Sequence, residues 1–143
     1  MDPGSIAWVL VSAALVLFMT PGLAFFYGGM DQRRNVLNML MMNFYCLLIV
    51  PIIWLVFGYS LAQVPFDNDF IGGFDEMMLK GISNLGEEGA TGTIATMVFL
   101  GMFAVITPAL ISGAVADRMK FSAWALFVPL WLVLVYAPIF NWV

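Results

Sequence analysis

The chain has 143 residues, of which 63% are hydrophobic and only 10% are charged, and its formal net charge is −4. A soluble domain carries roughly a quarter charged residues, so this composition excludes an ordinary soluble domain and indicates a chain whose solvent is the lipid bilayer. The chain has no histidine and a single cysteine, Cys46, which excludes histidine-based metal sites and an intrachain disulfide within these residues. We expect no metal, no cofactor and, from the acidic balance, no nucleic-acid partner.

Four long ranges carry no Asp, Glu, Lys or Arg: 3–30, 35–66, 89–116 and 121–143. Each reaches the ~20 residues that a helix needs to cross a ~30 Å hydrocarbon core. The chain is therefore predicted to be an all-α, polytopic membrane protein with four transmembrane helices. From the charge-free ranges and their flanks, we place these helices at about 5–28, 35–62, 91–116 and 122–143, with one extended outside loop at about 63–90.

The basic residues indicate how the chain is oriented in the plasma membrane. Arg33 and Arg34 lie in the first short loop, and Arg118 and Lys120 lie in the third, whereas Lys80 is the one basic residue of the acidic second loop. The positive-inside rule then makes loops 30–35 and 117–121 cytoplasmic and puts the N-terminus outside. No basic segment precedes the first apolar run, so we expect no cleavable signal peptide.

Local signals predict how several segments begin and end. Gly4 or Ser5 is expected to cap the first helix and Ser122 the fourth. The pair Gly28–Gly29 allows a left-handed exit from the first helix. Apolar residues near helical spacing in 74–82 predict a short amphipathic helix at the outer interface, with an ordinary solvated loop as the alternative.

Prolines and amides inside the spans predict interruptions and cross-links. Pro21, Pro51 and Pro108 each remove a backbone donor and are expected to kink or break their helices. Asn38 and Asn43 lie within the second span, where an unpaired amide is costly. We expect both amides to form hydrogen bonds with neighbouring helices.

Phe99 and Phe103 are spaced i, i+4, so they lie on one face of the third helix. Two interpretations stay open from the residues alone. Phenylalanines at helical spacing in a membrane segment pack or contact lipid, or their ring faces attract a small cation, worth roughly 0.5–2 kcal/mol.

Four segments carry a resemblance to a known family. The stretch from Thr20 to Leu40 closes one apolar segment, crosses a basic turn and opens the next, and it closely resembles the first helix–loop–helix of the ammonium transporter (Amt/Mep/Rh) family. Residues 99–107 and 112–123 are similar to the family's third helix and the following loop, and 131–138 to its fourth helix. The resemblance implies the N-terminal part of a fold with about eleven helices in two inverted halves.

The resemblance also implies roles for individual residues. Phe99 and Phe103 match the two phenylalanines that line the family's external ammonium site and gate. Tyr27 either faces the inner vestibule of the pore or simply packs. The chain reads Asn141-Trp142-Val143 and stops before the position of the family's site tryptophan, so Trp142 is not given that role. The pore histidines belong to later helices, and we expect that this chain alone does not conduct.

The function implied by the resemblance is transmembrane transport of ammonium or ammonia, by a protein that forms a homotrimer when full length. The alternatives are an ammonium-sensing or regulatory membrane module and a non-functional fragment. A P-II signalling protein could dock at the cytoplasmic face, and the loop contacts available to it are Arg33, Arg34, Arg118 and Lys120. An intramembrane enzyme is not expected, because the charge-free spans contain no acid and the chain no histidine to serve as a base.

Overall fold

A computed structural model describes residues 1–63, 72–73, 77–80 and 89–143. All regular elements within these ranges are helical, which confirms the all-α prediction. The elements in chain order are α1 (Pro3–Met30), α2 (Val36–Ile53), η1 (Trp54–Gly58), α3 (Tyr59–Gln63), η2 (Met77–Leu79), α4 (Ala90–Ser112), η3 (Gly113–Val115), α5 (Phe121–Trp131), η4 (Leu132–Tyr136) and α6 (Ala137–Trp142).

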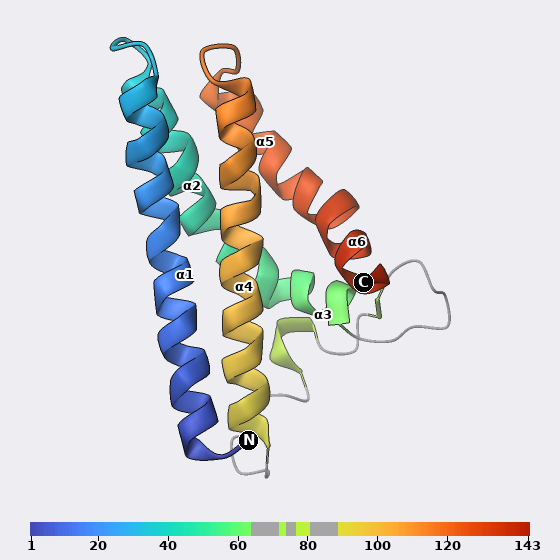
Figure 1. Cartoon of the computed structure of the whole chain (residues 1–143). Coiled ribbons are helices and arrows are strands. Elements are labelled where there is room, and N and C mark those ends of the chain that lie inside the picture. The colour runs from blue at the N-terminus through green and yellow to red at the C-terminus, as the bar shows by residue number, and fades with distance from the viewer. Residues whose placement is uncertain (64–71, 74–76, 81–88) are drawn as a thin grey trace.

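Four continuous spans in the described part of the chain are long and apolar enough to cross a membrane, as predicted. They are Pro3–Met30, Val36–Gln63, Ala90–Val115 and Phe121–Trp142. Helices α1 and α4 lie side by side along most of their length, α2 packs against both, and the span from α5 to α6 leans away from them towards α3 (Figure 1). The protein is thus a multi-pass membrane protein with a three-helix body and one inclined arm.

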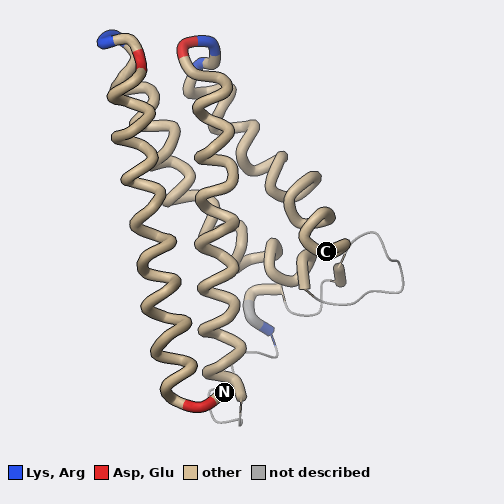
Figure 2. Tube along the Cα trace, viewed as in Figure 1, with Lys and Arg blue, Asp and Glu red and all other residues tan. Residues whose placement is uncertain are grey.

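Charged residues gather at the ends of these spans (Figure 2). Arg33 and Arg34 precede α2, and Arg118 and Lys120 precede α5, so both basic loops lie at the same end of the bundle. We call this the basic end, comprising residues 31–35 and 116–120. The shared location is what a common cytoplasmic face requires.

The first and fourth spans begin differently from the prediction. The N-cap of α1 is Asp2, whose carboxylate accepts the Ser5 N–H at 3.1 Å and the Ser5 hydroxyl at 2.5 Å. A carboxylate suits a helix N-terminus, and Pro3 at the first helical position needs no hydrogen-bond acceptor. The expected cap at Ser122 is also wrong, because α5 begins at Phe121 after an extended Lys120.

The predicted left-handed exit from α1 is wrong. Both Gly28 and Gly29 stay helical, and the chain leaves the helix through an extended Asp31 at φ −84°. A Cβ on Gly28 would lie 3.4 Å from Cγ1 of Val36 and 3.6 Å from Cδ2 of Leu40. Gly28 therefore serves close packing of α1 against α2.

The prolines do not end their helices. Helix α1 continues through Pro21 and α4 through Pro108. Pro51 lies inside α2, and the π-helical turn η1 follows it. In this turn the backbone hydrogen bonds span five residues in place of four. A second π-helical turn, η4, follows Pro129 in the fourth span and was not predicted.

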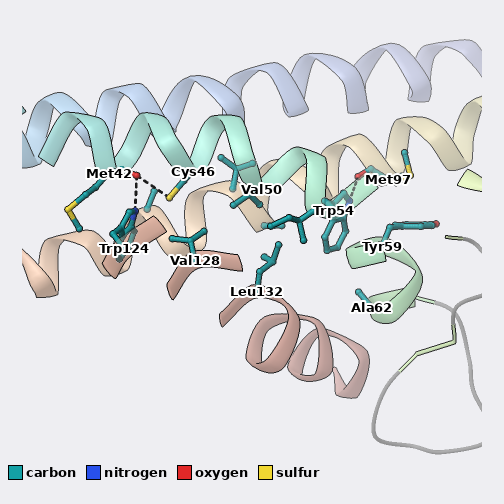
Figure 3. Packing of buried hydrophobic residues seen from close by; sticks show 14 residues of the cluster. Met42, Cys46, Val50, Trp54, Tyr59, Ala62, Met97, Trp124, Val128 and Leu132 are labelled. Carbon is teal, nitrogen blue, oxygen red and sulfur yellow. Dashed lines mark hydrogen bonds between the residues drawn. The ribbon is translucent and has the colours of Figure 1, made fainter. Parts of the chain in front are cut away.

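The core lies between α2, α4 and α5 (Figure 3). Its centre is filled by large buried side chains from three spans, among them Met42, Trp54, Met97, Trp124 and Leu132. By contrast, much of α1 turns apolar side chains outward, and Phe18 is 76% exposed. In a bilayer such a surface meets lipid or another protein segment without the penalty it would suffer in water.

The predicted interfacial helix at 74–82 falls largely outside the described residues. Within the described part, Met77–Leu79 form a single 3₁₀ turn. Before it, Gly72 donates its N–H to the Leu61 carbonyl at 2.9 Å. The Ser60 hydroxyl donates to the Gly73 carbonyl at 2.6 Å, so this part of the loop is tied to α3.

Candidate functional site

The candidate site is an aromatic pair on α4. The rings of Phe99 and Phe103 meet edge to face, with centroids 5.1 Å apart and planes at 77°. The structure thus brings the two predicted site residues together. Phe99 is half-buried and Phe103 is 39% exposed, although both lie within a span that carries no charge.

The opposite face of α4 is packed tightly against the rest of the bundle. Gly101, Ala104, Val105 and Ala109 are all buried. Small residues allow helix backbones to approach closely in a membrane. Helix α4 therefore has one face that builds the core and one that presents the phenylalanine pair.

Thr107 and Pro108 change the helical hydrogen-bond pattern in the turn that follows Phe103. Pro108 has no N–H, so the Ala104 carbonyl lacks its usual helical donor. The Thr107 hydroxyl donates to the Phe103 carbonyl at 2.7 Å, which adds a second donor at that residue. Side-chain bonds of this kind to the preceding turn bend helices slightly and can tilt the turn that carries the ring.

Tyr27 lies at a pocket of about 380 Å³ near the basic end. The pocket is lined by Tyr27, Met30, Asp31, Met39, Gly113, Ala116 and Asp117. The Tyr27 hydroxyl donates to the Leu110 carbonyl at 3.3 Å. A Cβ on Gly113 would lie 2.7 Å from Cζ of the ring, so Tyr27 both lines a pocket and packs α1 against the α4–η3 span.

A buried polar link joins α2 to α4 beside this pocket. The Asn43 amide donates to the Ser112 hydroxyl at 3.0 Å and to the Met39 carbonyl at 2.9 Å. The Asn38 amide reaches the Met119 carbonyl at 3.4 Å. The prediction that both amides bond to neighbouring helices is confirmed for Asn43, whereas Asn38 bonds to the loop before α5, and the links join residues about seventy to eighty positions apart in sequence.

A hydrogen bond between an amide and a carboxylate joins the two loops of the basic end. The Asn35 amide donates to the Asp117 carboxylate, and Asp117 holds a left-handed backbone at φ 62°. Partial burial, and then a hydrogen bond and like charge from Asp117, raise the pKa of the Asp31 carboxyl above its ordinary value.

The four basic side chains of this end lie outside the lining of the pocket. Arg33, Arg34, Arg118 and Lys120 are all exposed and do not line it. Their placement makes them available to a partner at this face. The part of the chain that the structure describes brings no three His, Cys, Asp or Glu residues together as a metal site.

Two residues that pack behind the phenylalanine pair were not predicted from the sequence. Trp54 packs behind α4, and Gly101 leaves room for its ring. Trp54 and Gly101 are 47 residues apart and lie in different spans, so the sequence gives no local signal of their contact. The signal that could have been used is a proline inside an apolar span, since both π-helical turns begin three residues after one, at Pro51 and Pro129.

The fold and the phenylalanine pair define a polytopic membrane protein whose apolar spans present an aromatic site. The family model of the "Ammonium Transporter Family" matches residues 7–143, and the chain belongs to that family.

Known relatives agree with this membership. The chain is 45% identical over 159 residues to an ammonium transporter of Mycobacterium tuberculosis, covering 99% of this chain and 33% of the relative. It is 46% identical over 145 residues to an ammonium transporter of Aquifex aeolicus, covering 100% and 34%. The crystal structure of Candida albicans Mep2 aligns with a TM-score of 0.85 at 26% identity, over 99% of this chain and 31% of that one. The chain therefore spans about a third of the length of the relatives it matches.

Proposed function

We propose that this chain forms one wall of a transmembrane pathway for ammonium or ammonia. The observation that carries the proposal is the edge-to-face pair of Phe99 and Phe103, with Phe103 exposed on a charge-free span. Membership of a transporter family supports the choice of substrate. Aromatic faces attract a small cation without burying a counter-charge, which suits reversible capture.

The pair contributes to transport in two steps. Phe99 and Phe103 contact the ammonium cation at the outer side, and their bulk narrows the path behind it. A full charge at the bilayer centre costs several kcal/mol or more, so ammonium gives up its proton and crosses as neutral ammonia. Because the chain contains no histidine, a histidine-based proton path requires residues beyond these 143.

We further infer that these four spans do not conduct alone. They supply one set of walls and leave Phe103 exposed, whereas a pore must be lined on every side. Methylammonium uptake by a 143-residue product in a transport-deficient strain would overturn this inference.

The orientation and partners complete the proposal. The basic end faces the cytoplasm and the N-terminus lies outside, as the positive-inside rule requires. The exposed apolar face of α1, which includes Phe18, meets lipid or neighbouring subunits of a homotrimer.

The exposed Arg33 and Arg118 contribute contacts for a P-II signalling protein. Native mass spectrometry tests the trimer, and loss of P-II co-purification in Arg33→Glu tests the docking.

The experiment uses a full-length chimera in which residues 1–143 replace the matching third of the Aquifex aeolicus relative. The alignment of 145 positions to 143 residues leaves little room for gaps, so the junction is well defined. Phe103→Ala should change ammonium flux or the selectivity against methylammonium by about tenfold, because it removes a ring worth about 1–2 kcal/mol.

Phe44→Ala is the matched control. Phe44 lies on a different span, is 43% exposed against 39% for Phe103, and also belongs to an edge-to-face pair, so its removal should leave transport within about twofold of the chimera. Unchanged transport in Phe103→Ala would count against the site. A chimera that binds ammonium and changes P-II docking but moves no substrate would favour the sensing alternative.

A further inference from the structure

The Trp54 side chain lies where three spans meet (Figure 3). It is 2% exposed and starts the π-helical turn η1. Its indole N–H donates to the Met97 carbonyl of α4 at 3.1 Å. On its other side the ring packs edge to face against Tyr136 of η4 and Phe140 of α6, at 6.2 and 6.0 Å between centroids.

Helix α4 is shaped to receive this ring. A Cβ on Gly101 would lie 2.8 Å from Cδ1 and 3.0 Å from Nε1 of Trp54, so only glycine fits at that position. Met97 and Gly101 are one turn apart, so the indole contacts α4 at two successive turns of the same face. These contacts resist both rotation and sliding of α4.

The Trp54 contacts lie on the side of α4 away from the phenylalanine pair. Phe99 follows Met97 by two residues, and Phe103 follows Gly101 by two, which is about 200° around a helix. A ring lies roughly 6 Å from the helix axis, so a rotation of about 10° displaces it by about 1 Å. Displacements of that size change binding geometry measurably.

The two π-helical turns place the partners of Trp54. Trp54 is the first residue of η1, and Gly58 at the end of this turn leaves room for its ring, since a Cβ there would lie 3.1 Å from Cε3 of the indole. In η4 the same irregularity ends at Tyr136, which holds the opposite edge of the ring. The two π-helical turns thus carry Trp54 and one of the rings that packs against it.

We propose that Trp54 is a positioning residue for the Phe99–Phe103 site. Through the Met97 carbonyl and the space at Gly101, it sets the rotation of α4 and so the place of the two rings. This inference rests on the proposed function, because the readout is the affinity and selectivity of that site.

The test compares two buried tryptophans in the chimera. Trp124, like Trp54, is buried and donates its indole N–H to a methionine carbonyl, that of Met42 at 3.0 Å. Trp54→Phe should raise KM for methylammonium about threefold or more relative to kcat, and shift its selectivity against ammonium. Trp124→Phe should lower the amount of folded protein to a similar degree while leaving KM and selectivity unchanged.

A second pair of variants checks the mechanism. Gly101→Ala drives a methyl group into the indole and should reproduce the KM change of Trp54→Phe. In the double variant the smaller ring makes room, so the effects should not add. Equal KM values for Trp54→Phe and Trp124→Phe, or additive effects with Gly101→Ala, would overturn the proposal.

A distance measurement separates this inference from the proposed function. Spin labels on Trp8→Cys and Phe103→Cys, in a Cys46→Ser background, report the place of residue 103 without any transport. Trp54→Phe should shift or broaden the distance distribution, whereas Trp124→Phe should not. If Phe103→Ala leaves transport unchanged while the distances respond, the site assignment fails and the positioning role stands; if the distances do not respond, the positioning role fails.

Discussion

The two ends of the bundle share indole hydrogen bonds but differ in backbone regularity. In the half next to the basic end, side-chain amides, hydroxyls and an indole bond to groups on other spans, as in Asn43–Ser112 and Trp124–Met42. At the other end, which we call the aromatic end, the Trp54 indole donates to the Met97 carbonyl, and its ring packs edge to face against Tyr136 and Phe140. Among the described residues both π-helical turns lie at the aromatic end, whereas the irregular element next to the basic end is the single 3₁₀ turn η3.

The difference shows what hydrogen bonds and aromatic contacts each fix between helices. A buried hydrogen bond fixes one distance and direction between two helices, so it sets the register of regular spans. An aromatic cluster has many similar arrangements, and the backbone irregularities select one of them. The candidate site lies on α4 near the aromatic end, where small rotations of a helix can be set by packing.

The largest expected effect tests the packing of the basic end. Trp124→Ala removes a fully buried ring and its bond to the Met42 carbonyl, and should cost about 3–5 kcal/mol. Unfolding of the purified chimera in an SDS titration, followed by circular dichroism, measures the loss. Trp131→Ala, a half-buried neighbour on the same helix, should cost clearly less. Equal losses would contradict a packed basic end.

The next effect concerns the contact of Tyr27 with the α4–η3 span. Gly113→Ala places a Cβ 2.7 Å from Cζ of Tyr27 and should destabilise the protein by about 1–3 kcal/mol. Gly29→Ala is the control, since a Cβ there meets nothing within 4 Å. Combining Gly113→Ala with Tyr27→Leu should recover part of the loss. In contrast to Gly101→Ala at the aromatic end, Gly113→Ala should leave KM unchanged.

A smaller effect isolates the interhelical amide. Asn43→Leu keeps the branched outline of the side chain and removes the bond to Ser112, so it should cost about 0.5–1.5 kcal/mol. Asn38→Leu should cost less, because its bond to the Met119 carbonyl is longer and half-buried. The same SDS titration measures both variants. A gain in stability for Asn43→Leu would show that packing, rather than hydrogen bonding, holds the basic end.

The smallest effect is a pH dependence of the basic end. The pKa of Asp31 is raised in the fold, so the associated stability is present below the ordinary aspartate value and is lost as pH rises through the raised value. Asp31→Asn should therefore stabilise the protein at neutral pH, by less than about 1 kcal/mol because solvent screens this partly exposed group, and the gain should vanish in acid.

Asp2 provides a comparison of opposite sign. Its hydrogen bonds with the Ser5 hydroxyl and N–H lower the pKa of its carboxyl, so the stability it adds to α1 is present above the ordinary value and lost as pH falls through the lowered one. Asp2→Asn should reduce the loss of stability in acid, whereas Asp31→Asn reduces the loss at neutral pH. The same slope for both variants would contradict these assignments.

Several features could be predicted because they depend on residues close in sequence. The four charge-free ranges predicted the spans, since a bilayer demands about twenty apolar residues in a row. The spacing of Phe99 and Phe103 predicted their contact, because residues four apart share a helix face. The cap at Asp2 was missed although it is local, because the two competing candidates, Gly4 and Ser5, lie two and three residues further on.

The chain by itself determined the number of spans, the basic loops and the face on which the phenylalanine pair stands, because periodicity and charge are local properties. Tertiary structure alone decided that Trp54 fills the space at Gly101 and that Tyr27 fills the space at Gly113. These contacts join residues from different spans, and any of several aromatic residues could have filled either space. Which ring lies behind the site depends on where the π-helical turns place the helices, and packing of all four spans selects that arrangement.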